Sequence, residues 1–397
     1  MNTRNREKER LTLLRKELRL AGVDLRGFLP PWARPKEIGD RIIRELLLAI
    51  EAPVHEGLIP TSGSLIVPKS ADLSALLPIE DAHLDLARKA ADGSSALLTF
   101  CENSLAGLLL LSPSSTPDLQ LARLARDLDG VPILRDRKGT VRLYGSMQAP
   151  FGSLQHAGRR WTVSPSINQA IYRVLQAAPM VDASRLFQLL EFALYVLSPW
   201  RIGATMVWLL SDRNPFGGID LRPLRLSISP KAGDPTIAFA AHLLAQYDGA
   251  TVVSRDGRLL VTNELLTPST TAETLLRRLP GTRHTSALRA SYDHPDILVV
   301  TVSADGPVTI FSDGLNIFEL GWFSVDEVAA AIRRISENYT FTSAYDTVCP
   351  KCGKTLQVEV LIVTGWREDE EGHCPVCNEM IAKAHCYHIF TRVKKVF

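Results

Sequence analysis

Two Cys-x-x-Cys pairs near the end of the chain are the most specific chemical signal in the sequence. Cys349 and Cys352 form the first pair and Cys374 and Cys377 the second, with 21 residues between the pairs. Each short turn presents two sulfurs on one side, and four thiolates arranged in this way suit a tetrahedral Zn²⁺. Other potential ligands lie nearby, although a closed structural site already has its four: His373, His385, Cys386 and His388. We therefore predict a structural zinc ion in a ribbon over residues 345–397, which residues 180–315 should not need for folding.

A second group of residues has the chemistry to handle phosphate. Pro280-Gly281 ends a helical stretch, and Thr282, Arg283 and His284 follow it. These residues offer a hydroxyl, a guanidinium and exposed backbone N–H groups at the start of a new helix, which is a favourable place for phosphate. A carboxylate from Asp248, at the start of a strand, would hold a divalent cation facing those phosphates. Carboxylate, cation and arginine around a polyphosphate indicate phosphoryl or nucleotidyl transfer. The alternative is an N-capping loop with a surface arginine.

At these residues the sequence resembles the diadenylate cyclase (DAC, DisA-N) family. The family signature is an Asp-Gly-Ala strand followed by Gly-Thr-Arg-His-Arg-Ala-Ala. Asp248-Gly249-Ala250 matches the first motif and Gly281-Thr282-Arg283-His284 matches the second. Residues 297–314 resemble the family hairpin that follows, and the resemblance covers about residues 180–315. It implies an α/β cyclase domain with a central mixed β-sheet flanked by helices.

The resemblance also implies a reaction and its site. The family condenses two ATP molecules into cyclic di-AMP and releases two pyrophosphates. By resemblance, Asp248, Arg283 and His284 would be catalytic, and Asp248 and Asp305 would bind Mg²⁺ or Mn²⁺. Nucleotide contacts would come from both motifs: Gly249, Ala250, Gly281, Thr282, Arg283, His284, Thr285 and Ser286. Because each domain holds one ATP, two domains must meet face to face, so a homodimer or larger homo-oligomer is expected.

The sequence departs from the family pattern at several positions. The second arginine of the family is Thr285 here, and the Glu-Glu pair of the hairpin becomes Ala304-Asp305, where Asp305 can equally be a simple Asp-Gly turn. The acid after Ser291 is replaced by Tyr292, with Asp293 one place later. These departures leave open a second function, that of a catalytically weak pseudo-cyclase that senses a nucleotide.

The loss of the second arginine suggests a compensation. Losing a guanidinium that holds phosphate in two bonds weakens a site, and Arg277, Arg278 or Arg289, or an arginine of the partner subunit, would supply the missing charge. If nothing compensates, Thr285→Arg should tighten ATP binding; if another arginine already fills the space, the same change should be neutral or harmful.

Length and composition predict a multidomain packed protein. The 397 residues are 46% hydrophobic and 22% charged, which is typical of two to three globular domains. We predict five segments: a basic helix and linker (1–35), an N-terminal α/β sensor domain or degenerate cyclase copy (36–165), the cyclase-like domain (166–322), a connecting helix (323–344) and the zinc ribbon (345–397). An activating ligand or protein would act through the N-terminal domain, but the sequence does not identify it.

An internal repeat would explain two α/β domains in one chain. Residues 121–145 resemble 240–264, since both read as helix, Asp-Gly, strand, basic turn and strand. Upstream, residues 63–67 resemble 203–207, and His-Ala-Gly-Arg-Arg at 156–160 is a candidate remnant of the phosphate motif. The alternative is that two α/β units merely share a common order of helices and strands.

Charge and targeting signals restrict the other partners. The net charge of +2 creates no overall field for nucleic acid or membrane, and seven basic residues balance seven acidic ones over 346–397. The basic stretch 5–20 is predicted to be a helix that packs on its own domain, with a membrane or nucleic-acid arm as the alternative. Because no export signal or spanning segment is visible and the cysteines have metal spacing, we expect a cytoplasmic protein.

Overall fold

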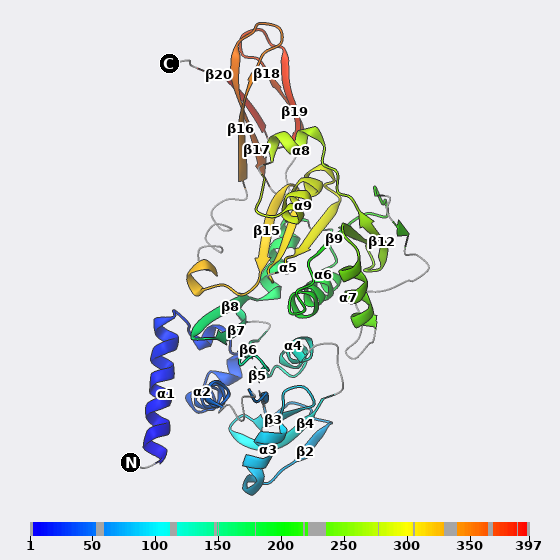
Figure 1. Cartoon of the computed structure of the whole chain (residues 1–397). Helices are drawn as coiled ribbons and strands as arrows, with labels where there is room; N and C mark the ends of the chain where they lie inside the picture. Colours follow the sequence, from blue (N-terminus) through cyan, green and yellow to red (C-terminus); the bar gives the residue numbers. More distant parts are fainter. Residues whose placement is uncertain are drawn as a thin grey trace.

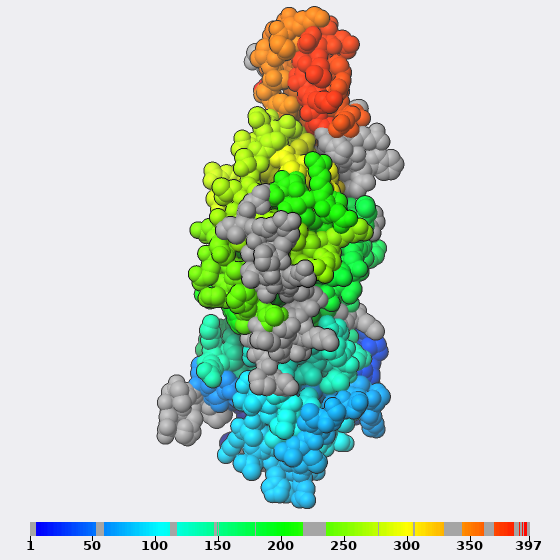
Figure 2. Space-filling model, turned by 90° about the vertical axis from the view of Figure 1, so that its right-hand side faces the viewer, coloured from blue at the N-terminus to red at the C-terminus, as the bar shows by residue number. Residues whose placement is uncertain are grey.

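The structure is a computed structural model that describes residues 3–52, 59–111, 117–146, 149, 151–178, 180–216, 219–220, 236–276, 278–304, 306–328, 340–363, 368–386 and 388–394. Three parts follow one another along an elongated molecule (Figures 1 and 2). We call them the N-terminal unit (3–165), the second unit (166–320) and the ribbon (340–394). The mixed α/β fold class and the C-terminal cysteine cluster expected from the sequence are confirmed. Within the described ranges, no helix is both long enough and apolar enough to cross a bilayer.

The N-terminal unit is built on an eight-stranded sheet with the strand order β2-β4-β3-β1-β5-β6-β7-β8. The central strand β1 is parallel to β3 and antiparallel to β5. The helices are α1 (Thr3–Leu20), α2 (Lys36–Glu51), α3 (Leu84–Ala90) and α4 (Pro117–Asp127). The strands are β1 (Ser62–Val67), β2 (Leu76–Pro78), β3 (Ala96–Cys101), β4 (Ser104–Leu110), β5 (Val131–Arg135), β6 (Val141–Tyr144), β7 (Phe151–Ala157) and β8 (Arg160–Pro165).

The basic helix α1 packs on its own unit, as the sequence predicts. Its apolar stripe is buried at Leu14 and Leu18, which are each 3% exposed and join the core beneath α2. Its charged face is tied to α2 by ion pairs of Arg10 with Glu51 and of Glu7 with Arg44. These ion pairs neutralise part of the charge of α1 inside the N-terminal unit. They argue against α1 as a membrane or nucleic-acid arm.

The second unit is built on a seven-stranded sheet with the strand order β10-β12-β11-β9-β13-β14-β15. The central strand β9 is parallel to β11 and antiparallel to β13. The helices are α5 (Ile167–Ala177), α6 (Ala183–Phe192), which continues into a π-helical turn (Ala193–Leu197), α7 (Thr236–Gln246), α8 (Thr270–Leu275) and α9 (Thr282–Asp293). The strands are β9 (Ala204–Leu209), β10 (Ile219–Asp220), β11 (Ala250–Val253), β12 (Leu259–Glu264), β13 (Ile297–Val302), β14 (Val308–Ser312) and β15 (Leu315–Leu320).

Strand β9 is buried on both faces, because helices cover both sides of this sheet. Met206 and Trp208 face the core formed with α6 and α7, whereas Val207 and Leu209 face the core formed with α8 and α9. A continuous apolar run is the usual sequence of a strand in this position. The unit therefore has two separate apolar layers, and the site described below lies on the α9 side.

The two units share their topology, which corrects the repeat alignment made from the sequence. Segment 240–264 spans α7, β11 and β12, whose counterparts by strand order are α3, β3 and β4. Segment 121–145 spans α4, β5 and β6, whose counterparts are α9, β13 and β14. The sequence comparison failed because helix-strand-strand stretches occur twice in each unit. The remnant proposed at 156–160 lies in the β7–β8 hairpin, which is not next to a helix start.

The segment after β15 returns to the N-terminal unit. Phe323 pairs with Val163 of β8 through two backbone hydrogen bonds of 2.7 and 3.0 Å. Helical structure begins at Val325 and is described as far as Val328; residues 329–339 of the expected connecting helix lie outside the described residues. Its predicted end at 344 is wrong, because β16 already begins at Thr340 and pairs along its whole length with the next strand.

The ribbon consists of a three-stranded and a two-stranded sheet. The strands are β16 (Thr340–Val348), β17 (Thr355–Val363), β18 (Glu368–His373), β19 (Met380–Cys386) and β20 (His388–Val393), with the order β16-β17-β20 in one sheet and β18-β19 in the other. Val358 and Val360 of β17 share one apolar cluster with Ala272 and Leu276 of the second unit. The ribbon core is therefore continuous with that unit, a packing contact that the sequence did not indicate.

Candidate functional site

Both motifs predicted to handle phosphate lie at the same end of the second sheet. Strands β9 and β11 are parallel, so Gly203 and Asp248, which precede them, come to one edge. Strand β13 runs the other way, and its pairing of Val302 with Ala204 brings the β13–β14 turn to that edge as well. Helix α9 begins above the same edge, because His284 at its start contacts Thr309 at the beginning of β14. Chain segments separated by about 100 residues of sequence thus meet at one place.

The floor of the site is a row of side chains that crosses five strands. In register from β12 to β14, the row reads Glu264, Ala250, Thr205, Thr301 and Thr309. The three threonines are at most 5% exposed. They lie on the face covered by α9, so the predicted phosphate loop stands over a hydroxyl-bearing surface rather than over a purely apolar one.

The Asp-Gly pair before β11 has the backbone that the sequence motif requires. Gly249 has a φ of +92°, which favours glycine, and an added Cβ would lie 2.9 Å from the carbonyl oxygen of Glu264. The side chain of Asp248 is exposed, whereas Ala250 is 2% exposed. The tight turn therefore leaves the Asp248 carboxylate in solvent at the edge of the sheet, where a cation and a nucleotide have access to it.

The phosphate loop leads into α9 through a glycine in the left-handed region. Gly281 is the N-cap residue of α9 and has a φ of +89°. The helix then begins with the exposed Thr282 and Arg283, so its first N–H groups and a guanidinium lie together at a helix N-terminus. A Cβ added at Gly203 would lie 2.6 Å from Nη1 of Arg283. The absence of a side chain at Gly203 therefore makes room for the Arg283 guanidinium beside the start of β9.

His284 is held by the floor of the site. Its Nε2 lies 3.2 Å from Oγ1 of Thr309, and its ring meets that of Phe311 edge to face with a centroid distance of 5.9 Å. Both partners come from β14, so this strand fixes the orientation of the imidazole. The arrangement directs His284 into the fold and leaves Arg283 as the exposed cation of the motif.

The side chain of Thr285 bonds to the backbone of its own loop (279–285). This finding corrects its assignment as a nucleotide contact. Its side chain is 7% exposed, and its hydroxyl donates toward the carbonyl oxygens of Leu279 and Gly281, both at 3.1 Å. The same oxygen accepts from the backbone N–H of Leu279 at 3.0 Å. Thr285 thus closes the 279–285 loop on itself and faces away from solvent.

We expect Thr285→Arg to destabilise the protein and to weaken nucleotide binding. An arginine at this position cannot make the three loop hydrogen bonds, and leaving buried backbone groups unsatisfied costs about 1–3 kcal/mol. The melting temperature and the affinity for an ATP analogue should both fall, as scanning calorimetry and titration calorimetry would show. The conservative control is Thr285→Ser, which keeps the hydroxyl and should stay close to wild type. Tighter binding by the arginine variant would show that the position faces the nucleotide after all.

The other residues considered from the sequence have structural partners or are not described. Arg289 pairs with Glu273 at 3.5 Å and reaches the carbonyl of Leu276, so it does not replace the missing arginine. Asp293 accepts hydrogen bonds from the backbone and hydroxyl of Ser269, which joins the end of α9 to the start of α8. Arg278 is exposed. Asp305, predicted to bind metal, and Arg277 lie outside the described residues.

Glu264 lies beside the two motifs, and sequence reasoning did not single it out. It pairs with Ala250 in the strand register, next to the Asp-Gly turn, and it lies on the α9 face of the sheet. Its Oε2 is buried and has no hydrogen-bond partner among the described residues, and burial raises the pKa of its carboxyl group. The signal in the sequence is a charged residue at the end of the apolar strand β12. Because the sequence does not show the bulges in this strand pair, it does not show on which face of the sheet the residue lies.

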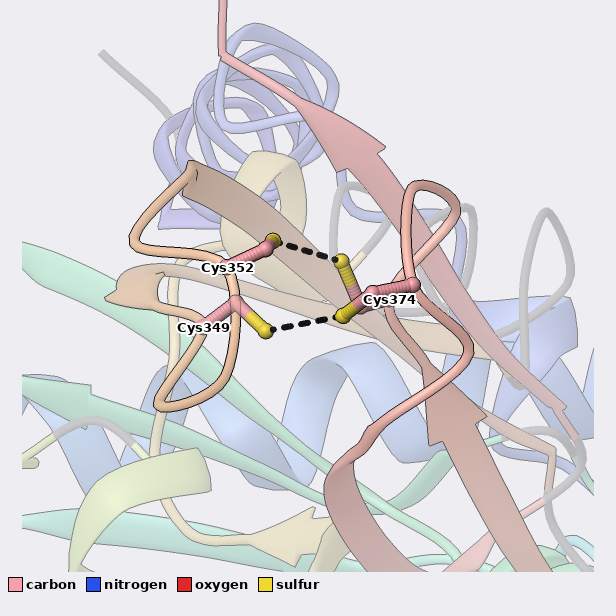
Figure 3. A group of neighbouring side chains, drawn as sticks. Cys349, Cys352 and Cys374 are labelled. Carbon is pink, nitrogen blue, oxygen red and sulfur yellow. Dashed lines mark hydrogen bonds between the residues drawn. The ribbon is translucent and has the colours of Figure 1, made fainter.

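The four predicted zinc ligands lie together in the ribbon, and Figure 3 labels Cys349, Cys352 and Cys374. The sulfurs of Cys349 and Cys377 are 3.5 Å apart and those of Cys352 and Cys374 are 3.6 Å apart, and all four lie within 4.8 Å of one another. Tetrahedral Zn–S bonds of about 2.3 Å need sulfur separations of about 3.8 Å. Although burial opposes it, backbone N–H groups of Cys352 and Lys351 lower the pKa of Cys349 to about 7. The donor set and its geometry therefore fit zinc.

Comparison with known families agrees with the site geometry. Residues 193–315 match the family model described as DAC, DisA bacterial checkpoint controller nucleotide-binding. The matched range contains the Asp-Gly turn, the phosphate loop and the sheet that brings them together. No curated protein and no solved structure matches the chain. The chain thus carries a match to the DAC nucleotide-binding domain over residues 193–315, which supports the diadenylate cyclase family.

Proposed function

We propose that the second unit condenses two ATP molecules into cyclic di-AMP, as a signalling enzyme whose activity the N-terminal unit regulates. The observation that carries this proposal is the meeting of both family motifs, Asp248-Gly249 and Thr282–His284, at one edge of one sheet. The match of residues 193–315 to a nucleotide-binding cyclase family supports the same reaction. ATP and reduced thiols are both available in the cytoplasm, where we place the reaction.

The proposed reaction assigns a task to each exposed group. The 3′-oxygen of one ATP attacks the α-phosphorus of the other, the bond to the bridging oxygen of pyrophosphate breaks, and the 3′-hydroxyl loses its proton. We assign that proton to Asp248, and the exposure of its carboxylate at the sheet edge supports this role. The α9 N-terminus and Arg283 are placed to neutralise the charge on the phosphates. Two such reactions close the ring and release two pyrophosphates.

The described carboxylates fit a divalent cation. Oxygen ligands are what Mg²⁺ and Mn²⁺ prefer. Asp248 belongs to the Asp-Gly turn before β11, and Glu264 ends the neighbouring strand β12 opposite Ala250. A cation would also relieve the cost of the partly buried Glu264 carboxylate, whose raised pKa records that cost. When bound, the cation would neutralise the triphosphate; the protein would supply the base and the arginine.

Ring closure requires two sites that face each other. One edge of the second sheet offers one set of motif residues, so the two ATP molecules of one product need two chains. We therefore propose a homodimer or larger homo-oligomer in which the edges carrying Asp248 and Arg283 are opposed. The exposure of both side chains is what such an arrangement needs.

A nucleotide-sensing pseudo-cyclase is the second candidate, and Thr285 favours it. The threonine replaces an arginine of the family motif, and its hydroxyl is used by the loop itself. The accessible Asp248 and Arg283 favour catalysis instead. Incubating the pure protein with ATP and Mn²⁺ or Mg²⁺, and identifying the product by mass, separates the two: cyclic di-AMP supports the enzyme, whereas bound and unchanged ATP supports the sensor.

We expect Glu264→Gln to raise the metal concentration that the reaction needs. Removing a carboxylate at the cation site should weaken metal binding about 10- to 100-fold. Because the pKa of this buried acid is raised, its ionised form opposes folding at neutral pH, so the glutamine variant should melt at the same or a higher temperature. The measurement is activity against Mn²⁺ concentration, with a melting curve alongside. An unchanged metal requirement would remove Glu264 from the site.

A further inference from the structure

The N-terminal unit repeats the fold of the second unit strand for strand. The order β2-β4-β3-β1-β5-β6-β7 corresponds to β10-β12-β11-β9-β13-β14-β15, and β8 is an addition. In both sheets the central strand is parallel to one neighbour and antiparallel to the other. Helix α3 precedes β3 as α7 precedes β11, and α4 precedes β5 as α9 precedes β13. Such agreement in order, direction and helix placement is the mark of two copies of one domain.

The β5–β6 and β13–β14 hairpins show which single residues of the two units correspond. The turns 136–140 and 303–307 have the same length and the same two backbone hydrogen bonds. Asp136 N–H donates to the Thr140 carbonyl at 3.0 Å, and Ser303 N–H donates to the Pro307 carbonyl at 2.9 Å. The second bond, from the turn glycine back to the first turn residue, is 2.9 Å in one hairpin and 3.0 Å in the other. By this register Arg142 corresponds to Thr309 and Tyr144 to Phe311.

In the second unit the start of α9 carries the predicted phosphate motif. In the N-terminal unit the start of the corresponding helix, α4, carries an acid. In the second unit His284 contacts Thr309 and Phe311. At the corresponding place Asp118, in the first turn of α4, bonds to Arg142 at 3.2 Å and accepts from the hydroxyl of Tyr144. A cationic motif is thus replaced by a carboxylate that neutralises its own arginine. Such a helix start repels phosphate instead of binding it.

The N-terminal unit retains an Asp-Gly pair, but its carboxylate is used locally. Asp92-Gly93 follows α3 at the same offset as Asp248-Gly249 follows α7, and Gly93 also has a positive φ, of +78°. The Asp92 carboxylate accepts from the backbone N–H groups of Ser94 and Ser95 at 2.8 and 2.7 Å. Although burial opposes it, these bonds lower the pKa of Asp92 to about 2. The carboxylate that would hold a cation is therefore tied into its own turn.

The α4 face of the N-terminal unit is covered by the second unit. Tyr195 of the π-helical turn packs on Tyr144 with a centroid distance of 6.3 Å, and burial together with the Glu191 and Asp118 carboxylates raises its pKa. Glu191, which is 3% exposed, bonds to Arg126 of α4 at 2.8 Å. Between these elements a cavity of about 20 Å³ remains, which is room for about one water molecule. No space for a nucleotide is left among these described residues.

We propose that the N-terminal unit is a second copy of the cyclase fold that has become a docking partner. It uses the face that bears the phosphate loop in the second unit to hold α6 and the π-helical turn of that unit, and it takes no nucleotide. The term phosphate loop comes from the proposed function of the second unit, so the inference rests on that function. The docked segment leads directly to the site, since Ser198 donates to the carbonyl of Gly306 at 2.6 Å and Gly203 lies beside Arg283. The chain then carries one ATP site, and its partner in ring closure is a second chain.

The first test counts nucleotide sites by titration calorimetry. The probe is α,β-methylene-ATP with Mg²⁺, whose methylene bridge prevents release of pyrophosphate. We expect one molecule per chain, complete loss of binding in Arg283→Ala, and no change in Asp92→Asn. Two molecules per chain, or a site that survives Arg283→Ala, would overturn the inference and leave the cyclase proposal standing. Absence of any binding would overturn the cyclase proposal instead.

The second test addresses the docking face and does not depend on nucleotide. In the full chain, Glu191→Gln removes the charge that pairs with Arg126, and Tyr195→Ala removes the ring that covers Tyr144. Both should increase hydrogen exchange in α4 (117–127), which belongs to the other unit. The matched control is Glu371→Gln, which removes a charge paired with Lys383 in the ribbon at 3.2 Å and should leave α4 unchanged. Unchanged α4 exchange in both interface variants would show that the second unit does not cover this face.

Discussion

Asp248→Asn should abolish formation of cyclic di-AMP while the protein stays folded. The amide keeps the shape of the side chain but neither takes a proton from the 3′-hydroxyl nor offers a charge to a cation. Loss of a general base lowers the rate by about 10²- to 10⁴-fold. The fold should tolerate the change because Asp248 is exposed, and exposed substitutions usually shift stability by less than about 0.5 kcal/mol. The measurement is product formation by mass spectrometry, together with a melting curve.

A second Asp-Gly turn in the same sheet is the matched control for this experiment. Asp256-Gly257 joins β11 to β12 at the opposite end of these strands, and its carboxylate pairs with Arg258 at 2.8 Å. Asp256→Asn should therefore retain nearly full activity. Comparable activity in both variants would contradict the assignment of Asp248, and comparable loss in both would indicate a general effect of altering this hairpin.

Loss of zinc should unfold the ribbon and expose an apolar face of the second unit. Four thiolates at this spacing should hold about one zinc ion per chain, and binding contributes folding free energy directly. Cys374→Ser, or treatment with a chelator, should release the metal and make residues 340–394 sensitive to protease. Because Val358 and Val360 share a cluster with Ala272 and Leu276, the melting temperature of the second unit should fall as well.

A control for zinc is Cys101, which lies outside the cluster. Cys101 is half-buried at the end of β3, so Cys101→Ser should leave the zinc content unchanged. Metal analysis of freshly purified, reduced protein gives the stoichiometry, and limited proteolysis gives the state of the ribbon. A zinc-free wild-type chain with a protease-resistant ribbon would rule out the metal site.

Local patterns in the sequence were sufficient to predict the grouping of the four cysteines and the turns of the two motifs. A Cys-x-x-Cys turn places its own two sulfurs, so the ligand set Cys349, Cys352, Cys374 and Cys377 was predictable from spacing and is borne out by the cluster. The Asp-Gly turn before β11 and the glycine before α9 likewise depend on backbone preferences of a few neighbouring residues, and both glycines have the positive φ that such turns need. The family resemblance rested on the same local segments.

Tertiary structure alone decided which of these residues meet and which way they face. The parallel pairing of β9 with β11 brings Gly203 to the edge that carries Asp248, and no local preference encodes a pairing between strands so far apart in sequence. The hydroxyl of Thr285 turns into its own loop, and Glu264 falls on the site face only because bulges shift the β11–β12 register.

The correspondence between the two units also became visible only in three dimensions. Their shared strand order survives although the sequence comparison aligned 121–145 with the wrong segment, 240–264; its other pairing, of 63–67 with 203–207, does match the counterparts β1 and β9. Sequence records the type and spacing of neighbours, whereas strand order and register depend on the burial of whole faces. Many different apolar residues satisfy that burial equally well. Two copies of a fold can therefore keep the same strand order after their sequences have stopped resembling each other.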